Sequence, residues 1–373
     1  MLEVRGLEDV VAAESSICYI DGERGILSYR GIDIHDLARQ SSFEEVCFLL
    51  WEGRLPRRDE LAATREAIGR ERAVPRELLS LLASLARTSV PMDALRTAVS
   101  ALASSDPEAQ DMNREANRRK VVRLTAQIGT IVAAFHRLRK GQAMVPPDPG
   151  RTHADDFLRM LNGETARSAA VRAFDTALIL HADHELNAST FAARVTAATL
   201  SDMHASVTSA IGTLKGPLHG GANEGVLRML QEIGSLERVD EEIHRRLSRK
   251  EKIMGFGHRV YTTEDPRATH LRRMSKEVAE SSGDTKLYDI SRRIEKILNE
   301  ERKLNANVDF YSASVYAMLG ISPDLFTPIF AVSRISGWTA HVMEQYSNNR
   351  LIRPRAEYTG PPYPQPYVPM EAR

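Results

Sequence analysis

Hydrophobic residues recur every three or four positions along most of the chain, with polar residues between them. This spacing is typical of helices that turn one face toward a protein core. Between Ala166 and Leu186, for example, it runs through Val171, Phe174 and Ala177. The pattern predicts helices at about residues 58–71, 75–87, 91–104, 114–140, 153–162, 166–186, 188–200, 202–214, 222–233, 238–249, 266–281, 285–300, 309–319 and 323–348.

Two short β-prone runs near the N-terminus interrupt the helical pattern. Residues 17–20 and 26–29 flank the glycine-containing turn Asp21–Gly25, which predicts a β-hairpin. So much helix with one strand pair predicts an all-α fold that carries a small N-terminal β-hairpin.

Local signals also predict where single elements begin and end. Ser42 and Glu45 form a capping box ahead of an apolar run, so a helix should begin there, and Gly53 should end it. The proline-rich segment 359–370 is expected to be extended.

Size and charge narrow the class of protein. The chain has 373 residues, which suits two domains, or one large one, and allows a core without disulfides. Lys plus Arg and Asp plus Glu both number 50, so the net charge indicates neither a nucleic-acid nor a membrane partner. Cys18 and Cys47 have neither disulfide-framework nor metal-ligand spacing, which fits a reducing cytoplasm.

The N-terminus lacks the pattern of a signal peptide, and the apolar runs are too short to span a membrane. Glu3, Glu8 and Asp9 stand where a signal peptide would have a basic and then an apolar region. No apolar run approaches the roughly 20 residues that a membrane-spanning helix needs. We therefore expect a soluble cytoplasmic protein.

Three breaks in the helical pattern carry ionisable groups. His219 and His258 each stand among glycines, and Asp309 opens an apolar, helix-like run. Glycine lets backbone or ligand approach each imidazole without a Cβ in the way. Two imidazoles and one carboxylate are a plausible set for acid–base chemistry at carbon. For each group taken alone, a structural role in a turn or as the helix cap is an equally open alternative.

The two histidines differ in their surroundings. His219 directly precedes the helix predicted at 222–233, whose N-terminal partial charge disfavours imidazolium, so His219 should be a neutral hydrogen-bond donor. Such an imidazole can polarise a carbonyl group. His258 follows the basic stretch 245–252, which suits either a phosphate-bearing ligand or a solvated helix face.

The segment HADHELN at 181–187 raises the question of a metal. On a helix, His181 and His184 would share a face, since they are three residues apart. The order H-x-x-H-E matches neither known zinc-protease pattern, so we predict no metal. A zinc hydrolase remains an alternative that chelation would test.

Three arginines indicate a small anionic ligand. Arg334 interrupts an apolar helix, where a buried guanidinium needs an anionic partner. Arg267 and Arg353 stand in DPR and RPR segments. Because guanidinium groups bind carboxylates in a bidentate manner, their convergence predicts a di- or tricarboxylate ligand.

Five segments together resemble the signature segments of the citrate synthase family, in the family's order. Each is weak alone, but the ordered set is specific, and the resemblance covers nearly the whole chain. The segments are HADHELN at 181–187, GPLHGGAN at 216–223, GFGHRVY at 255–261 with DPR at 265–267, NVDFYS at 307–312, and RISGW at 334–338.

The resemblance implies a helical homodimer whose small, mobile domain, residues 221–320, lies on the CoA side. Residues 1–220 and 321–373 would form the large domain and a C-terminal arm. The implied activity is that of an acyltransferase of the citrate (Si)-synthase type (EC 2.3.3.-) in the tricarboxylic acid cycle. It condenses acetyl-CoA with oxaloacetate through an enol(ate) and then hydrolyses the thioester. No cofactor is implied, because acetyl-CoA is a substrate.

The resemblance also assigns roles to single positions. Asp309 matches the base that deprotonates acetyl-CoA, His219 the donor to the thioester oxygen, and His258 the acid at the oxaloacetate carbonyl. The family's oxaloacetate ligands match His184, Arg267, Arg334 and Arg353, of which Arg353 is lent by the other subunit. The family's CoA loop matches Ile253, Met254, Gly255, Phe256 and Gly257.

Two positions depart from the family pattern. Thr262 stands where many relatives have a basic residue, which puts a CoA contact there in doubt, and Ala313 follows Ser312 in place of glycine. The chain length resembles that of dimeric members. One rival activity is 2-methylcitrate synthase, which uses propionyl-CoA, because one methylene is worth only about 1–3 kcal/mol in a pocket. The rival from another class is a non-catalytic scaffold of the same fold.

Overall fold

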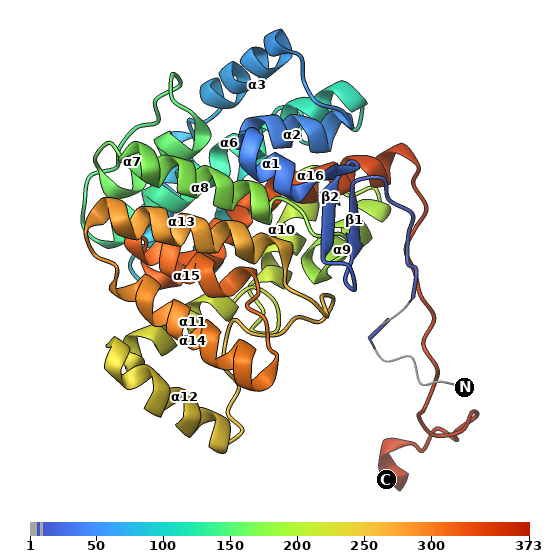
Figure 1. The fold of residues 1–373 in the computed structure, drawn as a ribbon. Coiled ribbons are helices and arrows are strands. Elements are labelled where there is room, and N and C mark those ends of the chain that lie inside the picture. Colours follow the sequence, from blue (N-terminus) through green and yellow to red (C-terminus); the bar gives the residue numbers. More distant parts are fainter. Residues whose placement is uncertain (1–5, 8–9) are drawn as a thin grey trace.

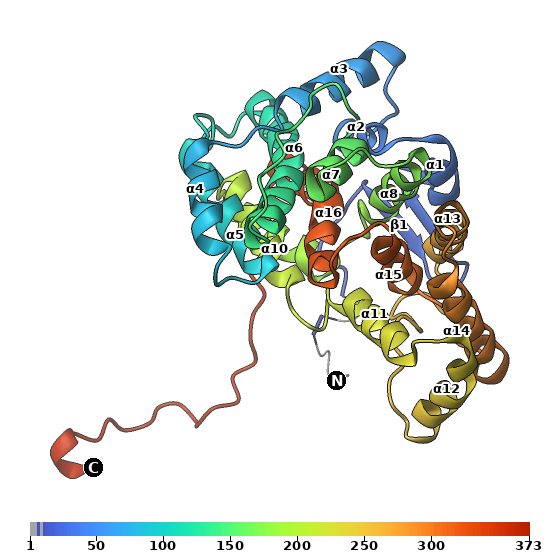
Figure 2. The same cartoon turned by 90° about the vertical axis from the view of Figure 1, so that its left-hand side faces the viewer.

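Helix α16 (Phe326–Ser347) lies in the middle of the molecule, among the other helices, in both Figure 1 and Figure 2. Most of its side chains are buried, including Trp338 and Arg334. The computed structural model describes residues 6–7 and 10–373, so Glu3, Glu8 and Asp9 lie outside the described residues. A short 3-10 turn (Pro323–Leu325) precedes α16, where the sequence predicted one continuous helix from residue 323.

The all-α prediction is confirmed, because helices form nearly all of the regular structure in the described residues. Predicted and observed ends agree to within a few residues, except where noted below. The other helices are α1 (Ile34–Gln40), α2 (Phe43–Glu52), α3 (Arg58–Arg70), α4 (Arg76–Leu85), α5 (Pro91–Leu102), α6 (Arg114–Arg139), α7 (His153–Asn162), α8 (Ser168–His181), α9 (Ala188–Ala198), α10 (Met203–Leu214), α11 (Ala222–Ile233), α12 (Val239–Ser248), α13 (Pro266–Ser282), α14 (Lys286–Arg302) and α15 (Val308–Met318).

The predicted hairpin is present and slightly larger than expected. Strands β1 (Cys18–Asp21) and β2 (Ile26–Tyr29) pair antiparallel, and the short β3 (Ile32–Asp33) adds a third strand to β2. The sequence analysis missed both β3 and α1. Each is very short, so neither offers enough residues for its periodicity to be recognised.

Local capping explains the helix ends that were predicted. The backbone N–H of Glu45 donates to the Ser42 hydroxyl at the start of α2, and Gly53 ends that helix with φ of 77°. A positive φ is easy only for glycine, so the helix stops there.

In Figure 1, α12 lies at the lower end of the molecule with α11 and α14 above it, and α15 and then α13 follow toward the middle. In Figure 2, α11, α12 and α14 lie at the lower side, whereas α13 lies beside α8 and α1. Helix α13 packs against α8 and α1 of the remaining body, and α11 packs against α16. The division of the chain at residues 221 and 320, and the movement of this part as a domain, stay predictions.

Beyond α16 the chain leaves the body as an extended tail (Figure 2). Its aromatic side chains are exposed, among them Tyr358, Tyr363 and Tyr367. Among the residues that the structure describes, no helix combines the length and apolar character needed to cross a bilayer.

Candidate active site

The loop after α8 corrects one prediction about the two neighbouring histidines. Helix α8 ends at His181, and His184 lies in the following loop, so the two do not share a helix face. His181 is buried, and its Nδ1 lies 2.8 Å from the Ala177 carbonyl. In the part of the chain that the structure describes, no group of three or more His, Cys, Asp or Glu side chains is arranged to hold a metal.

His219 is held by the N-terminus of α9. Its Nε2 lies 2.8 Å from the Ser189 hydroxyl and accepts a hydrogen bond of 3.3 Å from the Ser189 backbone N–H. The indole N–H of Trp338 donates to the same hydroxyl at 3.1 Å. A backbone N–H can only donate, so Nε2 carries the lone pair and Nδ1 carries the proton. The ring therefore presents a donor on the side away from Ser189.

Burial first, and the charge of Arg334 second, lower the pKa of His219 to about 4. The neutral state predicted from sequence is confirmed in direction. Burial and a nearby guanidinium both favour this neutral state, and the predicted contribution of the N-terminus of α11 stays a prediction.

His258 is held by its own turn. Its Nδ1 accepts the backbone N–H of Val260 at 3.0 Å and that of Tyr261 at 3.2 Å. Burial, and then the charge of Arg267, lower the pKa of His258 to about 4. With Nδ1 as acceptor, the neutral ring carries its proton on Nε2, which lies 3.5 Å from Nη2 of Arg267. Two donors that face each other in this way can share one acceptor.

Asp265 joins Arg267 to the start of α15. Its carboxylate accepts hydrogen bonds from Nε of Arg267 at 2.9 Å and Nη2 at 2.8 Å. The same carboxylate accepts the backbone N–H of Val308 at 3.0 Å. Both Asp265 and Arg267 are buried. Burial raises the pKa of the Asp265 carboxyl, but Arg267 outweighs it and leaves this pKa below its usual value.

Asp309 lies in the first turn of α15, one position inside the helix. The N-cap is Asn307, whose side chain accepts the Asp309 N–H at 3.0 Å, so the alternative that Asp309 itself caps the helix is wrong. Burial raises the pKa of Asp309 to about 6, against the lowering effect of Arg267 and Arg334. A carboxylate with such a pKa is mostly ionised at neutral pH and is a stronger base than usual.

Arg334 is buried on α16 and forms an ion pair with no described residue. Its Nε donates to the His181 carbonyl at 2.7 Å, and its guanidinium lies over the Phe330 ring at 4.6 Å. Burial lowers the pKa of Arg334, and among nearby charges Asp183 counters this most. The remaining donors of the fork are available to an anion.

His184, in the loop after α8, contacts Tyr261 and His258 in the turn that holds His258. Its Nε2 lies 3.1 Å from the Tyr261 hydroxyl, and its ring centroid is 5.5 Å from that of His258. Burial, followed by the charges of Arg267 and Arg334, lowers the pKa of His184. The structure thus brings His184, His219, His258, Arg267, Arg334 and Asp309 into one electrostatic neighbourhood.

The predicted CoA loop, residues 253–257, lies against the segment that precedes Asp309. Phe256 bridges Ala306, and the Gly257 N–H donates to the Asn305 carbonyl at 3.1 Å. Gly255 has φ of 85°, and a Cβ there would lie 2.8 Å from Cβ of Phe310. Only glycine allows this close approach.

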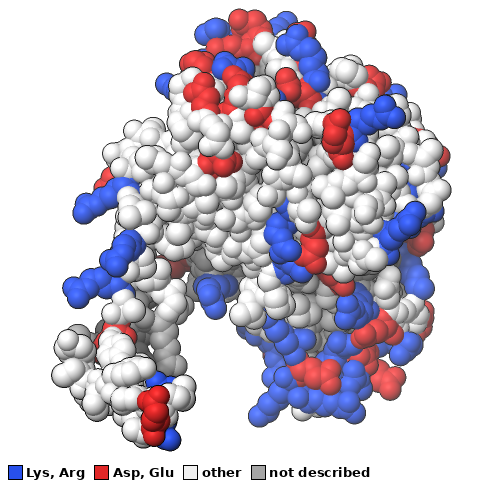
Figure 3. Space-filling model, turned by 180° about the vertical axis from the view of Figure 1, so that it is seen from behind, with Lys and Arg blue, Asp and Glu red and all other residues white. Residues whose placement is uncertain are grey.

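The arginines at the start of the basic stretch before this loop are paired with carboxylates. Arg245 and Arg246 both bind Glu242 within α12, and Figure 3 shows Lys and Arg interspersed with Asp and Glu at the lower end of the molecule. The solvated-face alternative therefore describes these two arginines better than a phosphate site.

Arg353 is the one predicted site residue that the structure does not bring to the others. It is exposed on the tail after α16. Within a single chain its side chain has no part in the site described above.

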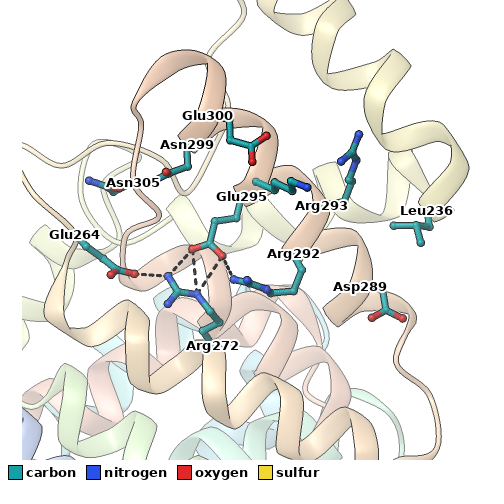
Figure 4. Close-up of a pocket in the computed structure, with 11 residues that line it drawn as sticks. Leu236, Glu264, Arg272, Asp289, Arg292, Arg293, Glu295, Asn299, Glu300 and Asn305 are labelled. Atoms are coloured by element: carbon teal, nitrogen blue, oxygen red, sulfur yellow. Dashed lines mark hydrogen bonds and ion pairs between the residues drawn. The ribbon is translucent and has the colours of Figure 1, made fainter.

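A cavity of about 590 Å³ lies beside α14 and away from these groups. Four basic and four acidic side chains line it, and Figure 4 shows Arg272, Arg292 and Glu264 gathered around Glu295. Glu295 also accepts the Tyr311 hydroxyl at 2.6 Å. The opposite charges neutralise one another, and the contacts hold α13, α14 and α15 together.

Sequence reasoning missed Ser189, Tyr261 and the bridging role of Asp265. Ser189 contacts His219 across 30 positions, and Trp338 reaches it across 149, so no local spacing connects them. Only the DPR segment hinted at Asp265, because an Asp two positions before an Arg at a helix start can cap the helix and pair with the side chain.

Comparison with known proteins shows the family of the chain. The family model described as "Citrate synthase, C-terminal domain" matches residues 6–355. Citrate synthase 2 of Bacillus subtilis is 56% identical, with 100% of each chain covered. The 2-methylcitrate synthase of Mycobacterium tuberculosis H37Rv is 44% identical, over 95% of this chain and 90% of its own.

A solved structure matches the fold over almost its full length. It is the ternary complex of carboxymethyl coenzyme A and oxaloacetate with citrate synthase from Thermoplasma acidophilum. Its TM-score is 0.92, with 33% identity and 99% of both chains covered.

Proposed function

The chain belongs to the citrate synthase family, and from this premise we propose which side chains carry each step of its reaction. That reaction is the condensation of acetyl-CoA with oxaloacetate and the hydrolysis of the resulting thioester to citrate and CoA. We assign Asp309 as the base, His219 as the donor to the thioester oxygen, and His258 as the acid at the oxaloacetate carbonyl.

The protonation states support these roles. The α-proton of a thioester is a very weak acid, so the base needs help from a donor that stabilises the forming enolate. Asp309 has a raised pKa of about 6, and His219 presents Nδ1–H. His258 presents Nε2–H, which can pass its proton to the carbonyl oxygen as the carbon–carbon bond forms.

The observation that carries the proposal is the pair of donors on His258 and Arg267. They lie 3.5 Å apart, both are fixed by contacts on their other side, and neither can accept from the other. A ligand that offers oxygen acceptors at this point satisfies both. Oxaloacetate supplies a carbonyl and two carboxylates, and the buried Arg334 is a further anion partner.

We extend the proposal to assembly. Arg353 would complete the oxaloacetate site of a second subunit, because its exposed tail leaves it away from its own site. Residues 221–320 would move as a domain to close over the substrates, with the 253–257 loop on the CoA side. Mixing an Arg353→Ala chain with an Asp309→Asn chain tests this. A shared site restores part of the activity in the mixed dimer, and sites complete within one chain restore none.

The main test is turnover by the purified chain. CoA release should require both oxaloacetate and acetyl-CoA, and Asp309→Asn should lower kcat by roughly 10³-fold or more, since a positioned base contributes about 10²–10⁴-fold. Oxaloacetate binding by calorimetry should be retained in this variant. Equal activity in wild type and variant would defeat the assignment of the base.

Propionyl-CoA gives the second candidate, because the 2-methylcitrate synthase is also a full-length relative. The values of kcat/KM for acetyl-CoA and propionyl-CoA, measured on the same preparation, decide between them. A clear preference for propionyl-CoA would replace the citrate assignment and leave the residue roles unchanged.

A further inference from the structure

A chain of buried polar groups runs from the oxaloacetate side of the site toward the end of α16. It begins at Asp183, which stands directly before His184 and is fully buried. Its Oδ2 lies 3.3 Å from Nε2 of His341 on α16, and both side chains are inaccessible to solvent. The proposed chemistry uses neither residue.

Arg194 fixes the direction of the hydrogen bonds in this chain. Its Nη1 lies 3.1 Å from Nδ1 of His341. A guanidinium can only donate, so Nδ1 carries the lone pair and Nε2 carries the proton that His341 donates to Asp183. One tautomer is thereby selected, and it connects a cation to a carboxylate.

The far end of the chain is anchored at the edge of the body. Arg194 also donates to Glu344 at 2.7 Å and to Gln345 at 3.1 Å. Glu344 in turn accepts the backbone N–H and the hydroxyl of Ser16, both at 2.9 Å. The buried charge of Arg194 is therefore compensated by Glu344, whereas Asp183 receives a hydrogen bond from a neutral imidazole on Oδ2 and its Oδ1 accepts none from the described residues.

Asp183 shapes the loop that carries His184. Its carboxylate accepts the Glu185 N–H at 3.2 Å, which turns the chain directly after His184. Glu185 has φ of 54°, a conformation that costs energy for a residue other than glycine and needs such support. The Tyr29 hydroxyl lies 3.1 Å from the Asp183 carbonyl and 3.3 Å from its N–H.

Asp183 also faces α16 at the turn that carries Arg334. A Cβ at Gly337 would lie 2.3 Å from Oδ1 of Asp183, so only glycine admits the carboxylate here. The Gly337 N–H donates to the Ala182 carbonyl at 3.1 Å. Among the nearby charges, that of Asp183 most strongly opposes the lowering of the Arg334 pKa by burial, so this carboxylate is the main counter-charge to the guanidinium.

We propose that Asp183 is a positioning residue for oxaloacetate, which holds His184 and Arg334 in place and is itself oriented by His341 and Arg194. The inference rests on the proposed function, since it concerns the same ligand. Asp183 touches neither substrate nor reacting atoms, so its loss should weaken oxaloacetate binding and leave the CoA side unchanged.

The test is Asp183→Asn, which keeps the shape and removes the charge. We expect the Kd for oxaloacetate, measured by calorimetry without acetyl-CoA, to rise at least about tenfold. The KM for acetyl-CoA should stay within about twofold. An unchanged oxaloacetate Kd overturns the inference, whereas a wild-type chain that binds no oxaloacetate overturns the proposed function itself.

A second pair of variants separates positioning from packing. His204 is a buried histidine on α10 that also faces a carboxylate, Asp106 at 3.4 Å, so His204→Phe is matched to His341→Phe. Both should lower Tm, but only His341→Phe should raise the oxaloacetate Kd. His341→Gln, whose amide can still donate to Asp183, should recover part of the affinity. Equal oxaloacetate affinity in all three variants rejects the inference, even if Asp183→Asn fails to fold.

Discussion

The two imidazoles of the site reach the same protonation state by different means. His219 is fixed by Ser189, whose hydroxyl accepts a hydrogen bond from Trp338, and both residues belong to helices distant in sequence. His258 is fixed by the backbone N–H groups of Val260 and Tyr261, two and three positions further along the chain. Burial places the pKa of each at about 4. A tertiary contact and a local turn thus produce equivalent neutral donors.

The two sides of the site are therefore held by different kinds of contact. The His258 side is self-contained, because Asp265 ties Arg267 to the α15 turn that carries Asp309. The His219 side is built into the central packing around α16. The contacts of His184 with Tyr261 and His258 span the two sides.

Of the variants that test this difference, Asp265→Asn should have the largest effect on stability and on the oxaloacetate KM. The change leaves Arg267 buried without its carboxylate and loosens the first turn of α15. Breaking a buried pair typically costs about 3–5 kcal/mol, so the free energy of unfolding should fall by about that amount. The oxaloacetate KM should rise by roughly 10²-fold. Denaturant unfolding measures the loss of stability, and steady-state kinetics measures the KM.

The matched control is Asp106→Asn, which breaks another largely buried pair, with Arg123 at 2.6 Å, outside the site. It should lower stability and leave the oxaloacetate KM unchanged. If both variants changed KM alike, general loosening of the fold, and not the Arg267 anchor, would explain the loss.

This contrast also explains what could be predicted from the sequence. The His258 turn, Gly53 and the Ser42 cap rely on neighbours in sequence, so spacing and residue type were enough to place them. Ser189 could not be found this way, because it meets His219 only after α9 and the 216–221 loop have packed together. The helix end at His181 was missed for a related reason, since Tyr29 and Gly337 hold the following loop from outside.

Ser189→Ala should act on the other side of the site, with a smaller effect. It removes the hydroxyl that orients His219 but keeps the backbone N–H, so the tautomer is retained and the ring position is loosened. We expect kcat to fall about tenfold, because a donor aimed at the enolate loses alignment, with the oxaloacetate KM unchanged. Steady-state kinetics with both substrates varied measure this. Ser206→Ala, on α10, is a control at another fully buried serine.

The pH dependence should show the smallest effect and separate the carboxylate from the imidazoles. Asp309 must be ionised to act as a base, and its pKa is raised to about 6, whereas both histidines stay neutral above about 4. The value of kcat/KM should therefore fall about tenfold between pH 7 and pH 5, with a midpoint near 6. A midpoint near 4 would assign the loss to the histidines.

The same shift has a consequence for stability with the opposite sign. A carboxyl group whose pKa is higher in the folded state stabilises the fold at low pH, and this contribution is lost as the pH rises through about 6. Asp309→Asn should therefore raise the free energy of unfolding relative to wild type at pH 8 and give little gain at pH 4. Denaturant unfolding at the two pH values measures this difference. An equal difference at both pH values would show that the pKa of Asp309 is not raised in the folded state.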